Sequence, residues 1–119
     1  MWRSLNELNV LRKRLAEYLS RRALGILEFF NIYCMSMYRV DCISLFFTTP
    51  SKLYYILLTH FRGDTTSTDY AFTLLFLSPL TLLLGLKETE VVKELLDLVK
   101  IGRDKEFLEL LARYARGDV

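Results

Sequence analysis

The sequence contains no glutamine, and asparagine occurs only at positions 6, 9 and 31. Proteins of hot environments tend to be poor in these heat-labile amides and rich in Glu, Lys and Arg. Lys and Arg together number 16 and Asp and Glu 14, so the formal net charge is only +2. We therefore expect a thermophilic source, and little long-range attraction of the whole molecule to nucleic acid or anionic membranes.

Glycine is also scarce, with five residues in the whole chain. The motifs GxGxxG, GxxxxGKS/T, HExxH and GxSxG are missing, as is an EF-hand loop, which excludes the commonest sites that such motifs build. One cluster of residue types used in catalysis surrounds the single histidine, His60. Its other members are Asp64, Thr65, Thr66, Ser67 and Asp69. Because helix caps and turns require the same residue types, we expect neither catalysis nor a cofactor.

Only two cysteines are present, Cys34 and Cys42, and both lie in apolar segments without CxxC spacing. We expect reduced, buried thiols in an intracellular protein, because a free cysteine behaves as a small hydrophobic residue and a disulfide here would close a very short loop. Two cysteines and one histidine are also too few for a four-ligand zinc site. The chain opens on polar and charged residues rather than on a signal peptide, so we expect a cytoplasmic location.

Apolar residues, in contrast, are plentiful. They make up 52% of the 119 residues, and the mean hydropathy is +0.22. A chain of this length forms one domain, 1–119, with much surface to keep hydrated. Either the core is unusually full, or part of the apolar surface meets a partner.

The longest stretch without charge runs from Tyr70 to Leu86. It is shorter than the roughly 20 residues that cross a bilayer, and Ser78-Pro79 interrupts it, so we expect no membrane span. Because proline breaks the ladder of helical hydrogen bonds, the stretch predicts a buried helix to about Leu77, a turn at Ser78-Pro79 and a short second helix ending near Gly85.

Capping residues and hydrophobic periodicity predict helices along the rest of the chain. A basic N-terminal helix, about 4–22, is expected to begin at Ser4 through a capping box with Glu7. Apolar central helices cover about 23–86, although 29–47 is also compatible with strands. Thr89 and Asp104 are placed to cap the two helices of an amphipathic hairpin, about 89–116. The fold class is therefore all-α: a single-domain bundle of about five to seven helices, ending in an antiparallel helical hairpin.

Within the central part, three further helix starts are expected. Asp41 is placed to cap a short helix through 42–47, and Thr49 precedes a proline at the first position of the next helix. Thr66 to Asp69 repeats the capping-box pattern with an aspartate.

Charged residues offer two candidate sites. Five basic residues of the N-terminal helix are candidate contacts for nucleic acid or another anion: Arg12, Lys13, Arg14, Arg21 and Arg22. Near the C-terminus, Glu90, Glu94 and Asp97 follow helical spacing, but Lys93 and Lys100 alternate with them. We expect these lysines to neutralise that face, so metal binding is not expected there.

The apolar excess favours a non-enzymatic interaction protein that self-associates through its mid-chain helices, as a homodimer by default. The apolar excess is also compatible with binding to a different protein. The candidate interface and core residues are Phe29, Phe30, Leu74, Leu75, Phe76, Leu80 and Leu83. The alternative is a small nucleic-acid-associated protein, a regulator or a subunit of a nucleoprotein complex, that uses the basic N-terminal helix.

Overall fold

The computed structural model describes residues 2–117, except for the side chains of residues 2–5 and 88. Its helical segments are α1 (Trp2–Arg22), α2 (Leu24–Tyr38), α3 (Cys42–Phe46), α4 (Pro50–His60), α5 (Thr65–Phe72), the π-helix η1 (Thr73–Leu77), α6 (Ser78–Leu84), α7 (Glu88–Lys100) and α8 (Asp104–Arg116). Because α5, η1 and α6 are continuous, the described chain has seven separate helices and no strand. This confirms the predicted all-α bundle, and 29–47 is helical apart from its turns.

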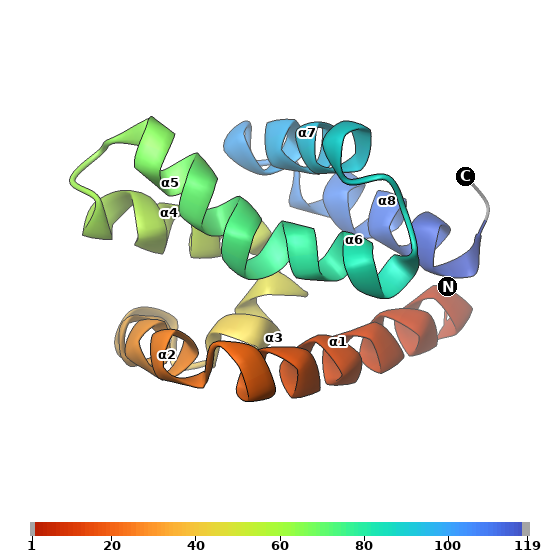
Figure 1. Cartoon of the computed structure of the whole chain (residues 1–119), viewed down its shortest axis with the longest axis horizontal. Coiled ribbons are helices and arrows are strands. Elements are labelled where there is room, and N and C mark those ends of the chain that lie inside the picture. The colour runs from red at the N-terminus through yellow and green to blue at the C-terminus, as the bar shows by residue number, and fades with distance from the viewer. Residues whose placement is uncertain (1, 118–119) are drawn as a thin grey trace.

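The helices surround one core. Helix α1 runs along one long side of the molecule, and the continuous helix α5–η1–α6 crosses over the centre (Figure 1). The hairpin of α7 and α8 packs on the far side of that helix, and α8 also contacts α1. Helix α2 lies at the end of the bundle, where it contacts α1, α3 and α4.

Four phenylalanine rings occupy the middle of this core. Phe46 of α3 stacks on Phe76 of η1 with 5.4 Å between ring centroids, and it meets Phe107 of α8 edge-on at 5.5 Å. Phe72 of α5 lies 5.9 Å from both Phe46 and Phe76. All four rings are almost completely buried. Aromatic contacts of this geometry therefore join the short helix α3, the long central helix and the C-terminal hairpin.

The long central helix corrects the predicted turn at Ser78-Pro79. The chain remains helical from Thr65 to Leu84, and Pro79 lies in the first turn of α6. In an α-helix, a proline ring clashes with the carbonyl four residues earlier. Here the preceding turn is a wider π-helix, in which the Ser78 N–H donates to the carbonyl of Thr73, five residues earlier. The wider turn accommodates Pro79 without ending the helix.

Several predicted caps are wrong, while the helices themselves are present. Helix α1 begins at Trp2 rather than at Ser4, and the Ser4 side chain lies outside the described ones. Helix α7 begins at Glu88, so Thr89 lies inside it. Asp64, not Thr66, caps α5, because its carboxylate accepts the N–H groups of residues 66 and 67. The cap of α3 is confirmed: Asp41 accepts the N–H of residue 44 at 3.1 Å.

Candidate interaction surface

Helix α2 is apolar on nearly all sides but covered on only one. Of its 15 residues, Phe30 and Cys34 are buried. Six large apolar side chains are exposed, each to between 44% and 69%, and we call them the α2 face: Leu24, Ile26, Phe29, Ile32, Met35 and Met37. A helix that is hydrophobic all round is normally enclosed by other helices. Helix α2 is instead packed on one side and exposed to solvent on the other.

The centre of the α2 face follows a single line along the helix. Since an α-helix turns about 100° per residue, Gly25, Phe29, Ile32 and Ser36 fall on nearly the same side. This side is opposite the buried Cys34. A Cβ atom on Gly25 would meet nothing within 4 Å, so contacts within the described chain do not require a glycine there. The only charged residue of α2 is Glu28. The face is therefore open, apolar and nearly uncharged.

One edge of the face is supported by His60, at the end of α4. The imidazole lies among four aromatic rings, with centroid distances of 5.5 Å to Phe29, 5.3 Å to Phe30, 5.8 Å to Tyr33 and 4.9 Å to Phe61. All four contacts are edge-on. In this position His60 holds the end of α4 against α2.

The predicted partners of His60 have other roles. Asp64 caps α5 and also accepts the hydroxyl of Ser67 at 2.9 Å. The Asp69 carboxylate accepts the hydroxyl of Tyr54 at 2.5 Å and the ammonium of Lys100 at 2.8 Å. Among the described residues, no hydrogen bond joins His60 to either carboxylate. His60, Asp64 and Asp69 therefore do not form the hydrogen-bonded cluster that was considered for them.

The other end of α2 is fixed by a disulfide bond between Cys34 and Cys42, which corrects the predicted reduced thiols. After Tyr38, Arg39 adopts a left-handed conformation with φ 61° and ends the helix. The chain then reverses direction, which brings the two Cα atoms to 5.4 Å. The N–H of Cys42 also donates to the side-chain carbonyl of Asn31 at 2.8 Å. Both sulfur-bearing residues are fully buried.

The structure divides the predicted interface and core residues. Phe30, Phe76 and Leu80 belong to the buried core, and Leu75 and Leu83 pack half-buried against it. Phe29 and Leu74 are exposed, to 45% and 55%. The prediction missed most of the α2 face.

The five basic candidates do not share one face of α1. At about 100° per residue, Arg14 and Arg21 point to similar sides, whereas Arg12 points almost opposite to Arg14. Arg14 donates to the carbonyl of Leu83 at 3.3 Å, and the guanidinium of Arg22 lies 4.9 Å from the Tyr18 ring centroid. Lys13 is exposed. The structure therefore does not gather these residues into one basic patch.

Two further features limit the possible sites. One stretch of the described chain, Thr65–Leu84, is long and apolar enough to cross a membrane by length and composition, but it also supplies Phe72, Phe76 and Leu80 to the core. The residues that the structure describes contain no group of three or more His, Cys, Asp or Glu side chains able to hold a metal ion. The α2 face thus remains the leading candidate for a functional surface.

Comparisons of the chain with family models, with curated proteins and with solved structures gave no match.

Proposed function

We propose that this protein is a non-enzymatic interaction protein, and that two copies associate through the α2 face to form a homodimer. The observation that carries the proposal is an apolar helix with only two buried residues. Water-exposed apolar area of this kind favours association. Two copies of the same face also bury each other equally, which closes the assembly.

The size of the face supports a second copy as the occupant. Its six side chains are each about half exposed and together leave on the order of 500 Å² of apolar surface uncovered. A standard interface buries about 800 Å² per partner, so the six side chains alone supply more than half of that area. Its single charge is the acidic Glu28. An acidic group on this helix is unfavourable against nucleic-acid phosphates or anionic lipid.

The composition supports a thermophilic source, and in such a source the disulfide is compatible with the proposed cytoplasmic location. Intracellular disulfides are rare in mesophiles but common in hyperthermophiles. The absence of glutamine agrees with such a source.

Sedimentation of wild-type protein and of Ile32→Asp tests the proposal. Ile32 is 69% exposed at the centre of the face, so the substitution leaves the monomer folded while placing a charge in the interface. We expect a wild-type dimer and a monomeric variant. Val10→Asp on α1, 52% exposed, is the matched control and should remain dimeric. A monomeric wild-type protein at all accessible concentrations contradicts self-association, as does a dimer insensitive to Ile32→Asp.

Two other binding assays separate this proposal from its competitors. Flotation of monomeric protein with liposomes, lost on Ile32→Asp, would assign the face to a membrane instead. The nucleic-acid alternative rests on Arg14 and Arg21, which share one side of α1. Salt-sensitive retardation of DNA or RNA, lost when both are changed to Glu, would favour it.

A further inference from the structure

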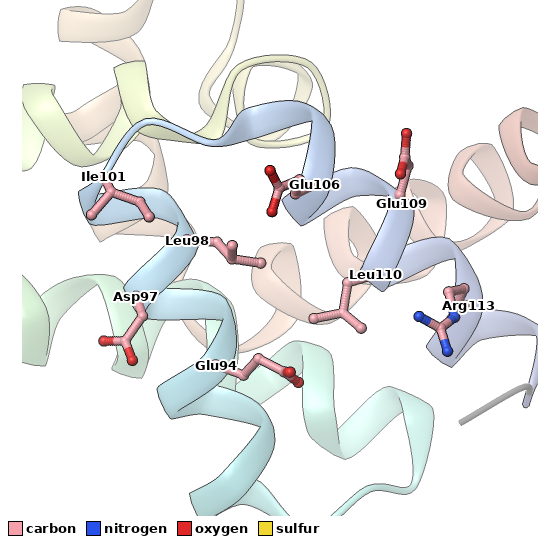
Figure 2. A pocket seen from close by; sticks show the side chains of 8 residues that line it. All are labelled: Glu94, Asp97, Leu98, Ile101, Glu106, Glu109, Leu110 and Arg113. Atoms are coloured by element: carbon pink, nitrogen blue, oxygen red, sulfur yellow. The ribbon is translucent and has the colours of Figure 1, made fainter.

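A second open surface lies between α7 and α8, separate from the α2 face. This groove of about 430 Å³ is lined by residues of both helices: Glu94, Asp97, Leu98, Ile101, Glu106, Glu109, Leu110 and Arg113. Figure 2 shows Leu98 and Leu110 reaching toward each other across its floor, and Ile101 at the end nearest the turn. Ile101 is 66% exposed, although it is aliphatic. The groove therefore has an apolar floor and an uncovered apolar end.

Carboxylates line both sides of this apolar floor. Glu94 and Asp97 come from α7, and Glu106 and Glu109 come from α8 (Figure 2). Arg113 is the one basic residue in the lining. The groove is thus acidic in a chain whose overall charge is positive.

Nearby cations neutralise only part of the groove. The ammonium of Lys100 pairs with Asp69 of α5 at 2.8 Å and is thereby directed away from Asp97. Arg103 pairs with Glu106 at 2.8 Å, and Glu94 accepts the hydroxyl of Tyr114 at 2.8 Å. For the side-chain carboxylates of Asp97 and Glu109, the described residues provide no ion pair or hydrogen bond. The acidic character therefore persists on both sides of the floor.

We propose that this groove binds a partner helix that carries aliphatic side chains on one side and Lys or Arg on its flanks. Leu98, Leu110 and Ile101 would receive the aliphatic side chains, as in other grooves that bind amphipathic helices. Asp97 on one side and Glu109 on the other would pair with the basic flanks. This charge complementarity selects basic over acidic helices and speeds their association.

The probe is a labelled 15-residue peptide of Leu and Lys in amphipathic order, and its matched control has Glu in place of every Lys. Fluorescence anisotropy with the full chain should show binding of the basic peptide only. Binding should weaken as salt rises from about 0.05 M to about 0.5 M, because salt screens the exposed charges. Equal binding of both peptides, or no binding of the basic one at low salt, would overturn the proposal.

Variants of the chain then locate the bound peptide. Asp97→Lys and Glu109→Lys should each raise the Kd about tenfold, and Ile101→Ser several-fold. Glu17→Lys on α1 changes the net charge by the same amount at an exposed position and should leave the Kd unchanged. If Glu17→Lys and Asp97→Lys weakened peptide binding equally, the attraction would be nonspecific. That result would refute binding in the groove. Ile32→Asp should bind the peptide normally, because this groove is separate from the α2 face.

Discussion

The carboxylate of Asp104, the first residue of α8, accepts the backbone N–H of Ser51 at 2.9 Å and the Ser51 hydroxyl at 2.8 Å. Ser51 lies in the first turn of α4, where the local N-cap residue, Thr49, forms no side-chain cap bond. A residue 53 positions away therefore satisfies a free N–H at the start of α4. The same contact holds the C-terminal hairpin against α4.

Asp104→Ala should destabilise the protein by about 1–2 kcal/mol, the usual effect of losing a charged cap. Urea unfolding followed by circular dichroism measures this change. Asp97→Ala, at an exposed position of α7, is the control and should stay within about 0.5 kcal/mol of wild type. Equal stabilities of the Asp104 variant and the wild type would show that the contact contributes nothing in solution.

The disulfide bond should stabilise the fold by constraining the unfolded chain. For a loop as short as the one between Cys34 and Cys42, separated by 8 residues, the expected contribution is about 2–3 kcal/mol. Cys34→Ala/Cys42→Ala should lower the melting temperature, and reductant should affect the wild type but not the variant. Thiol titration of wild-type protein unfolded without reductant gives an independent check. Two reactive thiols in that titration would contradict the bond.

Tyr114 predicts a loss of stability in strongly basic solution. Burial, together with the hydrogen bond to Glu94, raises the pKa of Tyr114 from 10.0 to about 12. Below pH 10, Tyr114 is protonated in both the folded and the unfolded state, so its contribution to the free energy of unfolding does not change with pH. Between pH 10 and about 12 the unfolded state loses its proton first, and stability falls as the pH rises.

Urea unfolding at pH values across this window tests the effect. Tyr114→Phe removes the ionisable group, so its stability should decline less steeply with pH than that of the wild type. Tyr70→Phe, at an exposed position of α5, is the control and should leave the slope unchanged. If stability declined equally steeply with pH in the wild type and in Tyr114→Phe, Tyr114 would not be the cause of the decline.

Local signals in the sequence were sufficient to predict the helices and the hairpin. They were not sufficient to predict contacts between distant segments. Asp41 caps its own helix as predicted, because that bond spans three residues. The cap of α4 comes from Asp104, and Asp69 bonds to Tyr54 and Lys100. No local pattern indicates such partners, since they depend on how the helices pack.

The α2 face was missed for a related reason. The sequence shows that α2 is apolar all round, which is compatible with complete burial. Whether Ile32 contacts other helices depends on how many helices the chain can pack around α2. In the structure the neighbouring helices cover only one side of α2, and Ile32 lies on the other. The disulfide was missed because its formation depends on the left-handed turn at Arg39.

The π-helix in the long central helix bears on how this chain tolerates changes in length. Phe72 and Leu80 both face the core, yet residues eight apart in an α-helix point about 80° from each other, and residues seven apart about 20°. The wide turn at Thr73–Leu77 thus absorbs one extra residue. Deleting one of its residues together with Pro79→Ala would leave a regular α-helix, with both halves still directed into the core.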